Sequence, residues 1–312
     1  MSSRSGHGQA FSAVLLLCAV IGQGECRALN ATGYDVVFDS NRSGTFGIHR
    51  MHLDGSGIEP VIDEEAHEIY PNPSPDGQWI AYARAESLER NANGDIYRCR
   101  PDGTGIQLIV KNGTFPEFSR DGEWIYFERD RKFLMKVPVA GGEAVKLAPR
   151  KDSILWGSSM VKPTISPDGR FAAIISNYPG TWFVGIVEIA TGDIRKVGHG
   201  CEPNWFGDGK TLAWVSSKSV KDRTGIKSFR IADGSVEVIQ DDGAPFGHEY
   251  FPWIEKSGKF LLWAACPPGQ HDHADSNYQI FAREMPSGTP IRLSHDEFTN
   301  RWPKGLRVIA RE

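Results

Sequence analysis

One short phrase recurs along the chain and constrains its fold more than any other feature. Each copy contains a proline, a few residues, a polar turn that ends in glycine, and then an apolar run suited to a β-strand. The copies are YPNPSPDGQWIAYAR from Tyr70, FPEFSRDGEWIYFER from Phe115, KPTISPDGRFAAIIS from Lys162, EPNWFGDGKTLAWVS from Glu202 and FPWIEKSGKFLLWAA from Phe251. Their turn glycines lie 40 to 49 residues apart. Repeats with this period indicate a closed array of similar β-sheets rather than two unrelated domains.

Each repeat has room for one four-stranded blade, in which the polar-Gly turn joins the first two strands. A sixth inner strand begins at 301–303, close to the last residue of the sequence. Strand-like segments at 35–39, 47–53 and 59–62 have the order of the three strands that it lacks. The sequence therefore predicts an all-β fold, a six-bladed β-propeller of four-stranded antiparallel blades that forms a single domain over residues 33–308. The N- and C-terminal segments share the closing blade, which leaves neither sheet edge unpaired.

The first 28 residues resemble an export signal. Arg4 gives a weakly positive start, and 11–21 is an apolar core that is too short to cross a bilayer comfortably. Small residues follow it, as at a cleavage site. We expect residues 1–28 to be removed and the protein to be periplasmic or extracellular, without a membrane span; a disordered leader or a membrane anchor is the alternative.

Charge, motifs and cysteine content limit the classes of partner and activity that we expect. The net charge is −4 and both signs are dispersed without a basic stripe, so nucleic acid is not an expected partner. The sequence contains no G-x-S-x-G nucleophile elbow, P-loop or dinucleotide fingerprint. Outside the signal, Cys99, Cys201 and Cys266 are too few for a disulfide framework, and a bridge between the last two is left open. We expect a monomer.

The phrases SNRSGTFGIHRMHLDGSG from Ser40 and SPDGQWIAYA from Ser74 resemble the repeat of TolB-like β-propellers. The resemblance covers nearly all of the chain beyond the signal, and it implies the fold and an exported location rather than one function. Two of the anchors, WFGDG and IEKSG, depart from the repeat. We see no room for the additional N-terminal domain of TolB, so we expect a different role from that of TolB itself.

Propeller topology sorts the loops onto two faces. Loops that lead into an inner strand, and loops between the second and third strands, open on one face, which we call the histidine face. The polar-Gly turns open on the opposite face, the turn face. Six of the nine histidines fall in histidine-face loops: His67, His199, His248, His271, His273 and His295. We predict that this face binds a ligand through His67, His199, Tyr250 and Arg301, with a protein or an acidic glycan as the partner.

The densest cluster of these residues belongs to the last two anchors of the chain. Imidazole and carboxylate ligands together suit a divalent metal such as Mn or Zn. Alternate residues of an extended loop face the same side, so His271 and His273 can approach one ion together. The predicted ligands are His248, Gln270, His271, His273 and His295. Polar loops without a metal are the alternative interpretation.

The string Gln270-His271-x-His273 also resembles the metal-binding residues of oligogalacturonate lyases, which are TolB-like propellers. That resemblance implies a metal that binds the uronate carboxylate and acidifies the neighbouring proton. Two functions therefore remain in view, and whether the protein is an enzyme is left open. The first is an exported binding or scaffold module that uses its histidine face, and the alternative is a metal-dependent polysaccharide lyase.

Overall fold

The computed structural model describes residues 33–89, 94–217, 223–241, 246–270 and 272–308. The predicted signal, residues 1–28, lies outside them. In the described part of the chain, no helix is long and apolar enough to cross a membrane.

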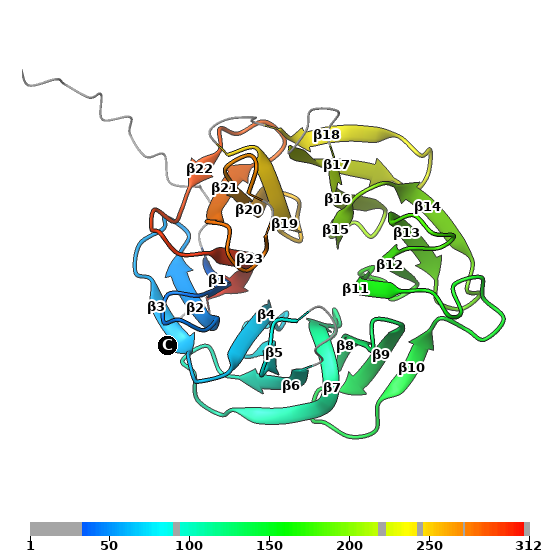
Figure 1. Ribbon diagram of the computed structural model, residues 1–312, viewed down its shortest axis with the longest axis horizontal. Helices are drawn as coiled ribbons and strands as arrows, with labels where there is room; N and C mark the ends of the chain where they lie inside the picture. The colour runs from blue at the N-terminus through cyan, green and yellow to red at the C-terminus, as the bar shows by residue number, and fades with distance from the viewer. Residues whose placement is uncertain (1–32, 90–93, 218–222, 242–245, 271, 309–312) are drawn as a thin grey trace, which may run out of the picture.

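Strands dominate the described residues and are arranged in antiparallel sheets around a central axis (Figure 1). Blade 1 contains β23 (Asn300–Arg307), β1 (Tyr34–Ser40), β2 (Gly47–His52) and β3 (Glu59–Ile62). Blades 2 and 3 contain β4 (His67–Pro73), β5 (Ile80–Ala85), β6 (Gly94–Cys99), β7 (Gln107–Phe118), β8 (Trp124–Arg129), β9 (Phe133–Pro138) and β10 (Val145–Ala148). Blade 4 contains β11 (Met160–Ile165), β12 (Phe171–Ser176), β13 (Phe183–Glu188) and β14 (Ile194–Gly198). Blade 5 contains β15 (Cys201–Trp205), β16 (Thr211–Ser217), β17 (Thr224–Arg230) and β18 (Val236–Gln240). Blade 6 contains β19 (His248–Ile254), β20 (Phe260–Cys266), β21 (Gln279–Glu284) and β22 (Ile291–Arg292).

Strand β7 belongs to two blades at once, which is why blades 2 and 3 form one seven-stranded sheet. Its first part is the outer strand of blade 2, where Val110 pairs with Ile96 of β6. Its second part is the inner strand of blade 3, where Phe118 pairs with Ile125 of β8. Each blade therefore still has four strands, and the predicted six-bladed propeller is confirmed.

Six apolar clusters lie between consecutive blades and form the core. Neighbouring residues of one strand contribute to different clusters. Val36 packs against blade 6 and Val37 against blade 2, because successive side chains of a strand point to opposite faces of its sheet. Both faces of each blade are covered, which explains why the second strands are nearly continuous apolar runs.

The predicted sharing of the closing blade is also confirmed. β23 pairs with β1, and Tyr34 lies opposite Arg307. Beside this pairing, the buried Arg301 guanidinium donates from Nε to Oδ1 of the buried Asp39 at 2.8 Å. The two ends of the folded region are therefore joined by backbone hydrogen bonds and by a buried ion pair.

The polar-Gly turns are held by their own side chains. In the first of them, Ser74 Oγ donates to Asp76 Oδ1 at 2.6 Å, and the Trp79 amide donates to Ser74 Oγ at 2.9 Å. Gly77 has a φ of 73°, and a Cβ at this position would lie 2.3 Å from the carbonyl oxygen of Arg307. Glycine is needed here both for the turn and for the close approach of the neighbouring blade.

Candidate functional site

Every inner strand has a β-bulge at the residue that precedes its proline. In β4, Ile69 pairs with Ala83 and Asn72 with Ala81, so two residues lie opposite one. The other five inner strands shift register at the same place. The bulged residues have φ values of 50–59° and are Tyr70, Phe115, Lys162, Glu202, Phe251 and Trp302. A left-handed conformation costs a non-glycine residue roughly 1–2 kcal/mol, and its recurrence in all six blades makes this ring a candidate functional feature.

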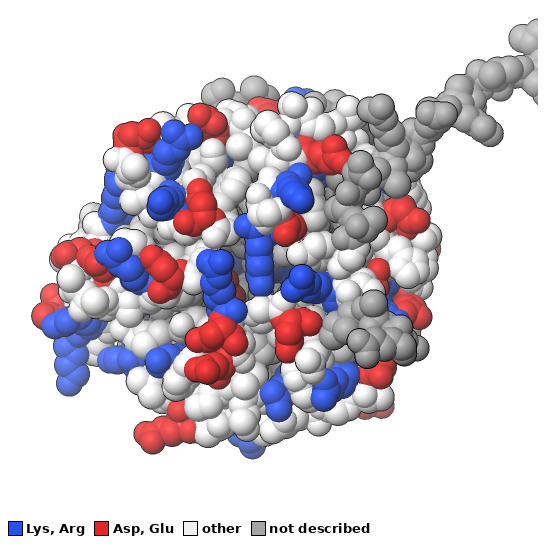
Figure 2. Space-filling view, turned by 180° about the vertical axis from the view of Figure 1, so that it is seen from behind, with Lys and Arg blue, Asp and Glu red and all other residues white. Residues whose placement is uncertain are grey.

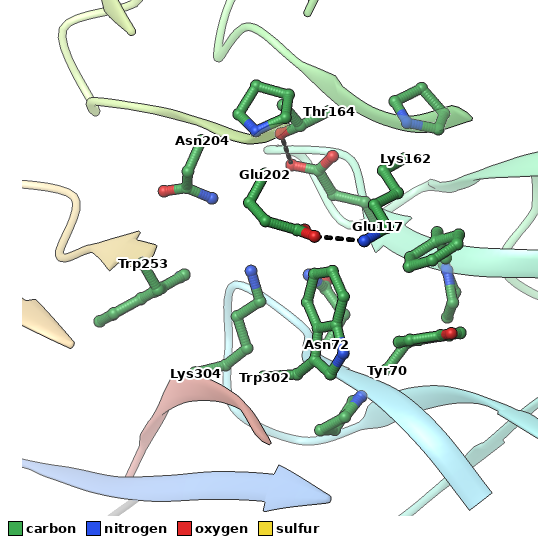
Figure 3. A pocket seen from close by; sticks show the side chains of 15 residues that line it. Tyr70, Asn72, Glu117, Lys162, Thr164, Glu202, Asn204, Trp253, Trp302 and Lys304 are labelled. Atoms are coloured by element: carbon green, nitrogen blue, oxygen red, sulfur yellow. Dashed lines mark hydrogen bonds and ion pairs between the residues drawn. The ribbon is translucent and has the colours of Figure 1, made fainter. Parts of the chain in front are cut away.

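We call these six residues the upper ring. Five of them line one pocket on the axis, where Figure 3 labels Tyr70, Lys162, Glu202 and Trp302, and Phe251 packs against Trp302. Tyr70 and Phe115 stack with ring centroids 3.9 Å apart, and Trp302 lies 5.1 Å from Tyr70 and 4.5 Å from Phe251. Lys162 completes the ring and forms an ion pair with Glu202. The upper ring therefore combines an aromatic cluster with one charge pair whose carboxylate is buried.

Two residues further along each inner strand, a second set of side chains forms the lower ring. Its members are Asn72, Glu117, Thr164, Asn204, Trp253 and Lys304. Several of them bind the next blade: Asn72 Oδ1 accepts from the Phe118 amide at 3.0 Å, and Asn204 Oδ1 accepts from the Ile254 amide at 3.2 Å. These contacts join neighbouring inner strands and fix the width of the channel.

A cavity of about 90 Å³ lies between the two rings. Figure 3 shows Lys162, Glu202 and Lys304 directed toward this space. Burial raises the pKa of Glu117 to about 7, although Lys304, the Ile165 amide and the Thr164 hydroxyl oppose that rise. Burial also raises the pKa of Glu202 and lowers the pKa of Lys304. Such shifts are common at functional sites.

Below the lower ring, the channel widens into a funnel of about 810 Å³ that opens on the turn face. Its wall contains the polar-Gly turns of several blades, together with the apolar residues Phe118, Ile165, Trp253 and Ile254. The face seen in Figure 2 carries Lys and Arg side chains around its hollowed centre, with Asp and Glu side chains among them. This funnel is larger than the cavity that lies between the two rings.

The residues predicted to bind a ligand on the histidine face have different surroundings. Tyr250 and Arg301 are 4% and 3% exposed, and Arg301 lies 3.6 Å from the Phe46 ring centroid while it binds Asp39. His67 Nδ1 accepts from the Phe46 amide at 3.2 Å. His199 is exposed, with Nδ1 3.1 Å from the carbonyl oxygen of Trp182. Of these four residues, His67 and His199 therefore offer the more accessible side chains.

The predicted metal ligands that the structure describes have different surroundings. His248 is buried, with its ring 5.4 Å from that of Tyr250, and His273 lies 4.8 Å from the same tyrosine. His295 is exposed beside the carbonyl oxygen of Arg292, and Gln270 Oε1 accepts from the Asn277 amide at 3.2 Å. His271 lies outside the described residues. Among those that are described, no three His, Cys, Asp or Glu side chains gather as a metal site.

The bridge left open between Cys201 and Cys266 is not formed, and Cys99 is also a free thiol. Burial raises the pKa of Cys266 to about 12. Cys266 Sγ donates to the carbonyl oxygen of Gln270 at 3.1 Å. These thiols therefore act as packing groups in the described structure.

Sequence reasoning missed both rings, although the signal was present. In every inner strand, the residue before the proline belongs to the upper ring, and the residue after it to the lower ring. The anchor phrase therefore marks the lining of the channel as well as the order of the strands.

No protein-family model matches the chain. A TolB homolog from Chlorobium chlorochromatii is 25% identical over 152 residues, which are 46% of this chain and 31% of that protein. The crystal structure of TolB from Acinetobacter baumannii superposes with a TM-score of 0.69 at 16% identity, covering 88% of this chain and 66% of that one. A putative TolB from Agrobacterium tumefaciens superposes with a TM-score of 0.62 at 19% identity, covering 84% and 88%.

Proposed function

We propose that this chain, a TolB-like β-propeller, is a binding module that receives a segment of a partner in the funnel of its turn face. The observation that carries the proposal is the funnel itself, a concave site of about 810 Å³ to which several blades contribute. Its volume is in the range typical of ligand sites, which is roughly 300–1,000 Å³.

The upper ring supports binding from one side only. Four aromatic residues and the pair formed by Lys162 and Glu202 meet across the axis above the lower ring. A segment that enters from the turn face would therefore stop at the upper ring and would not pass through the channel. The interblade hydrogen bonds of the lower ring keep the site formed before the ligand arrives, which reduces the ordering cost of binding.

The similarity to TolB favours a periplasmic location, as does the predicted signal at residues 1–28. A binding surface on the histidine face and a metal-dependent lyase activity stay predictions. They place the ligand on the other side of the ring, so one experiment can separate them from the proposal.

Photo-cross-linking in the native cell envelope tests the proposal. The photoreactive residue p-benzoylphenylalanine replaces Pro75 or Ser257 in the funnel and, as matched controls, Trp182 or His295 in histidine-face loops. We expect the two funnel positions to give the same covalent adduct, identified by mass spectrometry, and the two control positions to give none. Adducts from the control positions alone would contradict the proposal and support the histidine face.

A further inference from the structure

The charged residues of the funnel differ in what they already bind. Four carboxylates line it: Glu117, Asp121, Asp168 and Glu255. Each of them accepts hydrogen bonds within the protein. Asp121, for example, accepts from the Ser119 hydroxyl and the Glu123 amide, and these contacts hold its pKa below the usual range. The acidic side chains are therefore engaged in holding the turns and the lower ring.

Three cations at the mouth of the same funnel are not engaged in this way. Arg120, Lys256 and Arg307 are exposed, and no described residue accepts a hydrogen bond from their side chains or forms an ion pair with them. Two of them act on the third: desolvation lowers the pKa of Lys256, the charges of Arg120 and Arg307 add to this effect, and the charges of Glu255 and Asp76 oppose it. An acidic group placed among them would relieve this repulsion and form charge-assisted hydrogen bonds.

The neutral polar side chains of the wall are also largely occupied. The two asparagines accept from backbone amides of the next blade, and Ser74, Ser119 and Ser166 donate to the aspartates of their own turns. What remains for a ligand is mainly cationic groups and apolar surface, together with the side-chain NH2 groups of the two asparagines and the Tyr126 hydroxyl. A glycan presents many hydroxyls and needs matching donors and acceptors, whereas a peptide can present carboxylates beside apolar side chains.

We propose that the funnel binds an acidic polypeptide segment, with its carboxylates paired to Arg120, Lys256 and Arg307 and its apolar side chains against Phe118, Ile165, Trp253 and Ile254. This inference rests on the proposed function and names the chemistry of its partner. The funnel wall carries four carboxylates beside these three cations, so recognition comes from short-range pairing at the cations and not from a positive net charge.

Selection from a random eight-residue phage-displayed library tests the chemistry before the natural partner is identified. The probe is the full chain without residues 1–28, compared with the variant R120Q/K256Q/R307Q. The matched control is K111Q/K151Q/K210Q, which removes three exposed cations that do not line the funnel. We expect the selected peptides to be rich in Asp and Glu together with apolar residues. We expect them to bind the funnel variant about tenfold or more weakly, and to bind the control variant as they bind the parent.

Selected peptides without acidic enrichment would overturn the inference, as would acidic peptides that bind the funnel variant as tightly as the parent. Trigalacturonate, titrated calorimetrically, is the glycan probe, and tighter binding of it than of the selected peptides would also overturn the inference. Thermal unfolding of all three proteins checks that the substitutions leave the fold intact. If cross-links still form from Pro75 and Ser257 while R120Q/K256Q/R307Q binds the partner normally, the proposed function stands and this inference fails.

Discussion

Lys162 and Glu202 form an ion pair between the inner strands of neighbouring blades, in the upper ring of the channel. The Lys162 ammonium also lies 5.6 Å from the Phe115 ring centroid and 5.0 Å from that of Trp302. The Glu202 side chain is only 1% exposed. The pair therefore joins blades 4 and 5 and connects the charged side of the upper ring to its aromatic side.

Replacing Lys162 with methionine should destabilise the protein in a pH-dependent way. The change leaves the Glu202 carboxylate buried without its partner, and breaking a buried pair costs roughly 3–5 kcal/mol. Burial already raises the pKa of Glu202, so protonation at pH 5 should remove part of that cost. Urea denaturation at pH 5 and pH 8 measures the difference in the free energy of unfolding between K162M and the parent. The double variant K162M/E202Q should recover most of the loss at pH 8. An equal loss at both pH values would contradict the prediction.

Glu117 should lower the stability of the protein as the pH rises from 4.5 to 7. Its pKa is raised to about 7, so the folded state binds more protons than the unfolded state within this window. The free energy of unfolding of E117Q minus that of the parent should rise by up to roughly 3 kcal/mol across this window. Denaturant titrations at several pH values measure the difference, with E123Q as the exposed control. A difference that does not change with pH would refute this role of Glu117.

The strands could be predicted from the sequence because the repeat and the apolar runs record local geometry. The predicted segments 35–39 and 59–62 correspond to Tyr34–Ser40 and Glu59–Ile62 in the structure. The channel could not be predicted in the same way. A residue before proline is expected to be extended, which hides the bulge at Tyr70. The six upper-ring residues also differ in type, so no single chemistry marked them.

Arg301 is a second case in which the sequence did not predict the surroundings of a residue. The sequence put it on the histidine face near the closing blade, and a charged residue in that position suggested ligand contact. In the structure it is buried against Asp39 and Phe46. Burial depends on residues more than two hundred positions away in the sequence, which no local pattern of Arg301 and its neighbours could reveal.

Replacing Arg301 with methionine should therefore act on stability. The change leaves Asp39 buried and unpaired, which costs about 3–5 kcal/mol. Because Asp39 loses its charge in D39N/R301M, this double variant should recover much of the loss. A double-mutant cycle measured by chemical denaturation gives the coupling free energy between Asp39 and Arg301. Additive single effects, or a loss of ligand binding without loss of stability, would instead favour a role for Arg301 in binding.

The aromatic part of the upper ring should depend on Trp302. Its ring contacts those of Tyr70, Phe115 and Phe251. W302A removes these contacts and leaves a space in the upper ring. We expect the free energy of unfolding to fall by about 2–4 kcal/mol, which is below the full cost for a buried tryptophan because Trp302 is half-buried. W302F, the matched control, keeps an aromatic ring and should lose about 1 kcal/mol. Equal free energies of unfolding for the two variants would show that the aromatic contacts of Trp302 do not stabilise the upper ring.

Backbone hydrogen exchange of the free and partner-bound protein tests most directly whether the ligand enters the funnel. The partner is the one recovered by cross-linking from Pro75 and Ser257. Slower exchange on binding is predicted at 74–79, 119–124, 166–171 and 254–258, which are turn-face segments around the funnel. Slower exchange confined to histidine-face loops such as 177–182 and 294–299, with no change in the turns, would contradict a binding site in the funnel.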